Sequence, residues 1–254
     1  MIIIKSPEDI AKMRVAGRSA RVICETLAAR VSPGITTKAL EAEAAELMRC
    51  QGVKSAFLGY RGYPGTVCIS VNEEVVHGIP GPRRIAVGDI VGIDVGVLVG
   101  GFHGDTALTV MVGVTDPDVI RLVEVTKQAL QAGIAQARAG QRLSDVSHAI
   151  ERTATAAGFA VVRDFVGHGI GRQMHEEPQI PNYGPAGRGP KLRVGMTLAI
   201  EPMVNLGEAG VCVLDDGWTV VTRDRRPSAH FEHTVAVGET AADVLTESGI
   251  EKIT

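Results

Sequence analysis

The chain has 254 residues, of which 45% are hydrophobic and 22% are charged. This mixture is typical of a globular protein with a full apolar core and excludes a disordered, collagen-like or coiled-coil chain. The 26 Lys and Arg and 29 Asp and Glu leave a net charge of −3, which gives no basic field of the kind that binds DNA. No apolar run approaches the roughly 18 residues of a membrane span, and the start does not resemble a signal peptide, so we expect a cytoplasmic protein with no membrane contact.

Four helices are predicted from their start and stop signals. Ser6 and Pro7 begin the first helix, and the second runs from about Thr37 until Gly52 ends it. The same arrangement returns later in the chain, with a helix that begins at Asp116 and Pro117 and another over about residues 144–158.

The glycines around these helices indicate an internal duplication. Gly34 and Gly52 are 18 residues apart, as are Gly140 and Gly158, and the second pair follows the first at an offset of 106. We therefore predict one domain over residues 1–254 with two pseudo-symmetric helix–helix–strand halves, about 1–110 and 111–250.

Short β-branched runs bounded by Gly or Pro predict the strands. These runs are Thr66–Val71, Ile90–Val99, Ala107–Val112, Met196–Ile200, Trp218–Thr222 and Phe231–Val237. Helices packed on a mainly antiparallel sheet make the fold class α+β.

Four carboxylates lie within these strand-like runs or directly at their ends, where apolar residues are expected. They are Asp94, Asp105, Glu201 and Glu232. Taking a charge out of water costs several kcal/mol unless something compensates, and neighbouring acids repel one another. One buried acid is usually a hydrogen-bonded structural group, whereas four of them favour a cation site.

Hairpin geometry places two of these acids together. If Gly100 and Gly101 form a two-residue turn, Asp105 faces Gly96, and Asp94 lies two residues further along the same strand. Strand side chains alternate with a period of two, so Asp94 and Asp105 emerge on one face as diagonal neighbours. That spacing suits two metal ions, and two divalent cations also balance four carboxylates in charge.

Histidines supply the remaining ligand type. His168 lies in a Gly-rich segment, and His175 follows seven residues later. An oxygen-rich shell with one nitrogen fits Mn, Fe, Co or Zn, and the sequence does not distinguish these metals. We interpret four other histidines as structural: His103, His148, His230 and His233. His103 and His233 flank metal-ligand candidates, so for these two a contact that orients a ligand side chain stays open.

These residues, in this order and these contexts, resemble one family closely. The segments 59–80, 89–110, 166–184, 195–203 and 231–237 are similar to those of bacterial-type (type I) methionine aminopeptidases, which have the pita-bread fold. The resemblance covers nearly the whole chain. It implies that the enzyme removes the initiator methionine from nascent proteins and peptides, with a preference for a small second residue, through attack of a metal-activated water on the first peptide bond.

The resemblance also implies a role for each ligand. Asp94 would chelate one metal ion, Asp105 and Glu232 would bridge two, and His168 and Glu201 would complete the second. Glu201 would also carry the proton.

Further roles follow from the same resemblance. His175 would hydrogen-bond near the scissile carbonyl oxygen, and His77 would contact the scissile amide or the next residue. The methionine pocket would be formed by apolar and aromatic side chains: Phe57, Tyr60, Tyr63, Cys68, Met174 and Trp218. Asn72 and Ser228 resemble positions around a monovalent-cation site. Arg61 and Met174 depart from the residues most common in the family.

Two alternatives stay open at this point. A proline-specific aminopeptidase or dipeptidase of the same fold uses the same five ligands, although such relatives usually carry a large N-terminal domain. Metal-free binding proteins of the fold lack the ligands that are present here. We expect a monomer, and a family that works on nascent chains predicts transient ribosome contact through Arg223–Arg226 or the basic first helix, although a solvated surface is the simpler interpretation of both.

Overall fold

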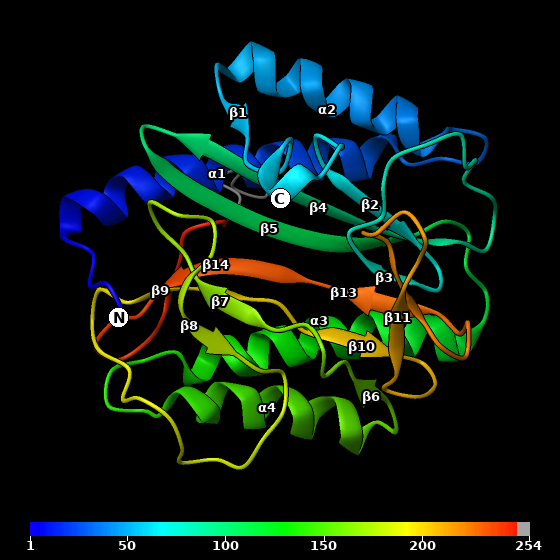
Figure 1. Ribbon diagram of the computed structural model, residues 1–254. Helices are drawn as coiled ribbons and strands as arrows, with labels where there is room; N and C mark the ends of the chain where they lie inside the picture. Colours follow the sequence, from blue (N-terminus) through cyan, green and yellow to red (C-terminus); the bar gives the residue numbers. More distant parts are fainter. Residues whose placement is uncertain (248–254) are drawn as a thin grey trace, which may run out of the picture.

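The computed structural model describes residues 1–247, in which four helices and fifteen strands occur (Figure 1). The helices are α1 (Pro7–Arg30), α2 (Thr37–Gln51), α3 (Pro117–Gln136) and α4 (Leu143–Ala156). None of the described helices is both long and apolar enough to cross a bilayer.

The helix ends carry the predicted caps. The Ser6 hydroxyl accepts a hydrogen bond from the Asp9 amide at 3.2 Å, and the Asp116 carboxylate accepts one from the Asp118 amide at 2.9 Å. Gly52 ends α2 in the left-handed region at φ 67°, where glycine has no steric penalty. The fourth helix begins at Leu143, one residue before the predicted start.

Nine strands form the main sheet, and every pairing between them is antiparallel. Along the sheet the order is β1-β4-β5-β14-β9-β7-β8, with β2 on β4 and β15 on β14. Their bounds are β1 (Lys54–Ser55), β2 (Cys68–Val71), β4 (Ile90–Val99), β5 (Phe102–Met111), β7 (Gly167–Gly169), β8 (Glu176–Ile180), β9 (Thr197–Ile200), β14 (Glu232–Ala236) and β15 (Asp243–Val244).

Two three-stranded sheets extend this core. One has the order β13-β10-β6 and the other β11-β12-β3. The strands are β3 (Glu74–Val76), β6 (Ala160–Val161), β10 (Met203–Asn205), β11 (Val211–Val213), β12 (Val220–Thr222) and β13 (Ser228–His230).

The predicted strand bounds need correction in three places. The strand expected over Ala107–Val112 begins five residues earlier, at Phe102, because β4 and β5 pair along their full length as one long hairpin. The strands expected from Thr66 and Trp218 begin at Cys68 and Val220 instead. The α+β class with a mainly antiparallel sheet is confirmed.

Helices α1 and α3 cover the same face of the main sheet. Gly104 neighbours Asp105 on β5, so a Cβ at Gly104 would lie on the opposite face of the sheet from the Asp105 side chain. There it would come within 2.4 Å of the Gly17 nitrogen in α1. On α3, a Cβ at Gly133 would touch Ile200 of β9 at 3.4 Å. The helices therefore occupy one face and leave the other face of the sheet for a site.

The two halves of the chain meet at the centre of the sheet, where β5 pairs with β14. Two apolar cores flank this meeting point, one between α1, α2 and the strands of the first half and one around α3 and α4. In the view of Figure 1, α1 and α2 lie above the central strands, and α3 and α4 lie below them. The duplication of residues 1–110 in 111–250 stays a prediction.

Candidate metal centre and active site

The register of the sheet places the acids in rows across its open face. Antiparallel pairing aligns Cys68 with Asp94, Asp94 with Ala107, and Ala107 with Glu232. Directly opposed residues point to the same face, so these four side chains form one row over four strands. Glu201, which directly follows β9, comes opposite Glu232 at the end of this row.

A second row runs beside the first. Gly96 faces Asp105, as the turn geometry predicts, and the Thr234 hydroxyl donates to the Asp105 carbonyl at 2.8 Å. Thr234 faces Ala199, which in turn faces His168. The small residues in both rows leave the space that the longer acidic and imidazole side chains enter.

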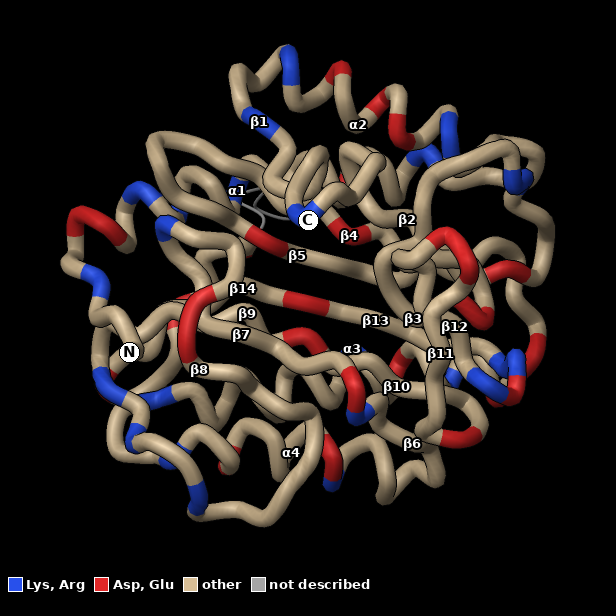
Figure 2. The backbone as a smooth tube through the Cα atoms, in the orientation of Figure 1, with Lys and Arg blue, Asp and Glu red and all other residues tan. Residues whose placement is uncertain are grey.

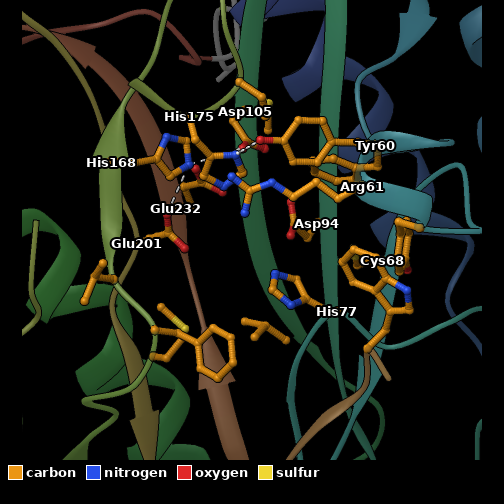
Figure 3. Close-up of a pocket in the computed structure, with 18 residues that line it drawn as sticks. Tyr60, Arg61, Cys68, His77, Asp94, Asp105, His168, His175, Glu201 and Glu232 are labelled. Carbon is orange, nitrogen blue, oxygen red and sulfur yellow. Dashed lines mark hydrogen bonds and ion pairs between the residues drawn. The ribbon is translucent and has the colours of Figure 1, made fainter. Parts of the chain in front are cut away.

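The two rows converge on one cavity of about 160 Å³ (Figure 3). Ligand atoms of Asp105, His168 and Glu232 lie within 4.8 Å of one another, and Asp94 and Glu201 line the same cavity. Figure 2 shows acidic segments in β5 and β14 at the centre of the molecule and no basic segment on either strand.

Unpaired oxygens mark this cluster as incomplete without a cation. The buried atoms Oδ1 of Asp94, Oδ1 of Asp105 and Oε1 of Glu232 have no hydrogen-bond partner. Buried carboxylate oxygens are almost always paired or bound to a cation, because an isolated charge costs several kcal/mol. The donor set, oxygen-rich with one imidazole, therefore fits divalent metal ions.

Burial and mutual repulsion hold the protons on these acids when no cation is bound. Burial raises the pKa of Asp94 to about 7, although a hydrogen bond with Asp105 opposes the shift. Burial and neighbouring carboxylates also raise the pKa values of Asp105, Glu201 and Glu232 well above their ordinary range. A site that strongly disfavours its own negative charges binds divalent cations with a compensating gain.

His168 is prepared as a neutral ligand. Its Nδ1 lies 2.8 Å from the Gly169 carbonyl oxygen, so Nδ1 donates there and Nε2 keeps its lone pair. Nε2 lies 3.4 Å from Oε1 of Glu201 and 4.0 Å from Oδ2 of Asp105. Burial lowers the pKa of His168 to about 3, which keeps the imidazole unprotonated at neutral pH.

His230 was expected to be a structural residue, but it lies beside the metal-ligand candidates. Its buried Nε2 has no hydrogen-bond partner and lies 4.0 Å from Oε2 of Glu201. Burial lowers its pKa to about 3, so it is neutral. Its position two residues before Glu232, which is the spacing of side chains on one face of an extended chain, was the available signal.

Aromatic and apolar side chains form the wall of the cavity. The Tyr63 and Trp218 rings meet edge-on at 5.1 Å, and the Phe57 ring lies over Gly96, where an added Cβ would come within 2.4 Å of it. Every predicted member of the methionine pocket lines this cavity: Phe57, Tyr60, Tyr63, Cys68, Met174 and Trp218. Phe165, Val76 and Met203 also line it and were not predicted.

Two further histidines face the cavity from loops. His175 stacks on Tyr60 with ring centroids 5.4 Å apart, and its Nδ1 lies 2.9 Å from the Tyr60 hydroxyl. The His175 ring also lies 4.2 Å from the His168 ring. His77 has a positive φ of 59° and meets the Phe165 ring edge-on at 5.6 Å. Burial lowers the pKa of His77 to about 4.

The predicted monovalent-cation residues lie together but outside this cavity. The Ser228 amide donates to the Asn72 carbonyl at 2.9 Å, and the Asn72 side chain is bonded to Asp89 and Ile90. His103 and His233, which flank metal-ligand candidates, point instead to the Gly171 carbonyl and the Thr246 hydroxyl. His148 lies by the Gly184 carbonyl oxygen.

Comparison with known proteins identifies the family of this site. The model of metallopeptidase family M24 matches residues 11–239. The chain belongs to this family. A methionine aminopeptidase of Bacillus subtilis is 50% identical over 246 residues, which cover 97% of this chain and 99% of the relative. As a member of a metallopeptidase family with a convergent acid–imidazole cluster, the protein binds divalent metal.

Solved structures of related proteins share the fold throughout. The crystal structure of methionine aminopeptidase from Thermotoga maritima is 48% identical, with a TM-score of 0.96 over 98% of this chain and 100% of that chain. The prolidase of Pyrococcus furiosus is 22% identical, with a TM-score of 0.78 over 97% of this chain and 66% of its own. The latter likeness concerns the fold alone, and together these structures confirm the pita-bread architecture.

Proposed function

We infer that this protein is a methionine aminopeptidase, a metal-dependent hydrolase that removes the N-terminal methionine of newly made proteins and peptides. The observation that carries this inference is the sheet register, which supports placement of five ligand candidates on one open face beside an aromatic pocket. Relatives at 43–50% identity over nearly their whole length bear the same name. A proline-specific function is not favoured.

We propose that two divalent ions occupy the cluster. Asp94 would hold one, His168 and Glu201 the other, and Asp105 and Glu232 both. Two divalent charges balance four carboxylates, whereas one would leave a buried charge of −2. Bound there, the ions supply Lewis acidity that polarises the scissile carbonyl and lowers the pKa of the attacking water. The metal is Mn, Fe, Co or Zn.

The chain's own groups bind and orient the peptide in this account. As the family resemblance implies, the free, unprotonated α-amine of the first residue would bind at a metal ion, so only a peptide with a free N-terminus fits. The aromatic wall, with Phe57, Tyr63, Cys68 and Trp218, takes the unbranched thioether, and aromatic rings contact sulfur favourably. A hydrophobic pocket of this kind accepts methionine without hydrogen bonds to its side chain.

His175, His77 and Glu201 act on the peptide bond. His175, oriented by Tyr60, donates to the carbonyl oxygen, where negative charge develops. His77, held against Phe165, contacts the scissile amide and restricts the second residue to a small side chain. Glu201 moves a proton from the attacking water to the leaving nitrogen, with the neutral His230 beside it.

The test is release of methionine by metal-loaded protein. Met-Ala-Ser is expected to be cleaved. Ala-Pro and Xaa-Pro peptides are not expected to be cleaved, and neither are peptides in which Met precedes a bulky residue. Cleavage of the proline peptides in preference to Met-Ala-Ser would overturn the assignment.

We further propose that the protein works as a cytoplasmic monomer on chains that leave the ribosome. The substrate class supports this location, since initiator methionine is exposed where translation occurs. The exposed Arg223, Arg225 and Arg226 or the basic face of α1 would touch ribosomal RNA. Asn72 and Ser228 would flank a monovalent cation, as the family resemblance implies.

A further inference from the structure

A buried ion pair links the segment before α1 to the loop that carries His175. The Lys5 ammonium lies 2.5 Å from the Glu176 carboxylate, and both side chains are only 4% exposed. The Lys5 amide donates to the Gly195 carbonyl at 2.8 Å, which fixes the lysine backbone against the neighbouring loop. This pair is separate from the metal-ligand cluster and takes no part in the mechanism above.

The Glu176 carboxylate also organises the loop that precedes it. Its Oε1 accepts a hydrogen bond from the Gln173 amide at 3.2 Å. Gly171 packs directly on the pair, since a Cβ there would lie 2.5 Å from Cε of Lys5 and 2.7 Å from Oε1 of Glu176. Residues 171–176 therefore wrap around the ion pair, and Glu176 begins β8 at its end.

Met174 and His175, which lie within this wrapped segment, both line the cavity. His175 directly precedes Glu176, so a shift of the glutamate backbone moves the imidazole. The contacts that orient this imidazole, with the Tyr60 hydroxyl at 2.9 Å and the His168 ring at 4.2 Å, depend on its position.

We propose that Lys5 is a positioning residue of the active site: its ion pair with Glu176 holds the 171–176 loop in the shape that aims His175 into the cavity. This inference rests on the proposed function, in which His175 acts on the peptide carbonyl. A buried ion pair is weak evidence for stability, because well-packed apolar residues often stabilise as much. Its effect here is on geometry, and a displacement of about 1 Å at a reacting group costs up to about 100-fold in rate.

The experiment compares Lys5→Met, Glu176→Gln and the double variant with the wild type, by kcat and KM on Met-Ala-Ser and by bound metal. We expect a loss of about 10- to 100-fold in kcat for each single variant. Metal content is expected to stay at the wild-type value, since the ligands lie on other elements. The double variant leaves no unpaired buried charge, so it serves as the folded test if a single variant unfolds.

A double-mutant cycle separates positioning from general damage. In a His175→Ala background, Lys5→Met is expected to lower kcat by less than about 2-fold, because the group it positions is gone. An equal loss in both backgrounds, or a loss explained by missing metal, would overturn the proposal.

A matched control is available in the same loop. Arg172 pairs with Asp9 at 3.2 Å and also joins the start of the chain to residues 171–176, but its side chain is 64% exposed. Arg172→Met is expected to change kcat by less than about 2-fold, because exposed pairs contribute little.

The outcomes also separate this inference from the function on which it rests. If the wild type does not release methionine with any of the four metals, the proposed function fails. If the wild type is active, and if Lys5→Met and the double variant both fold and keep the wild-type kcat, only the positioning role is wrong.

Discussion

Replacing Asp105 by Asn is expected to have opposite effects on the metal-free and metal-bound protein. Ligand atoms of Asp105 and Glu232 lie within 4.8 Å. At an effective dielectric constant of about 20, two full charges at that separation repel by about 3.5 kcal/mol. Proton uptake relieves part of this repulsion, because the raised pKa values leave some acids protonated.

The asparagine is therefore expected to raise the free energy of unfolding of the metal-free protein by about 1–3 kcal/mol. In a chain of this length that corresponds to a rise in Tm of about 2–12 °C. With metal present the same substitution removes a ligand, so the increase in Tm on metal addition shrinks and methionine release falls by at least about 100-fold.

The assay is thermal unfolding at pH 7.5 with EDTA and with added Mn, together with methionine release. Asp89→Asn is the matched control, since Asp89 accepts ordinary hydrogen bonds from Asn72 and Ala86, each at 2.8 Å, and its loss is expected to lower Tm in both states. If Asp105→Asn behaved like this control and kept its activity, the reasoning about the acid cluster would be wrong.

The remaining predictions concern pH, pocket shape and ligand nitrogen. The carboxyl pKa values are raised in the folded protein, with Asp94 at about 7, so the folded metal-free protein binds more protons than the unfolded chain. Its free energy of unfolding therefore falls as pH rises from about 6.5 to 8.5. The buried histidines, whose pKa values are lowered, act in the opposite sense only below about pH 6.5. Tm in EDTA should decrease over this range, and a flat profile would contradict the account. Gly96→Ala should displace the Phe57 ring, cost about 1–3 kcal/mol and raise KM for Met-Ala-Ser more than it lowers kcat; an unchanged KM would contradict the pocket. His168→Ala should leave the fold intact and weaken metal binding by at least about 10-fold in a titration, and unweakened binding would remove it from the ligand set.

Much of this site follows from local rules of sequence. The Gly100–Gly101 turn predicts that Asp105 faces Gly96, and the register confirms it. That result depends only on the two-residue turn and the alternation of side chains, both of which act over short range. The helix caps at Ser6 and Asp116 were predictable for the same reason.

Other features depend on contacts that no local pattern encodes. Strand β7 consists of Gly167, His168 and Gly169, residues that do not favour strands. Its glycines permit close approach to a neighbouring strand, since a Cβ at Gly167 would lie 2.5 Å from the Ala199 carbonyl oxygen. The approach of His230 to Glu201 and of Lys5 to Glu176 joins segments far apart in sequence. Only the folded chain brings these side chains together.

The most direct test of the central claim is the position and number of metal ions in crystals of the Mn-loaded protein, measured by anomalous scattering. The account predicts two peaks about 3.5–4 Å apart, within ligand distance of Asp94, Asp105, His168, Glu201 and Glu232. A single peak, or peaks away from these five side chains, would contradict it.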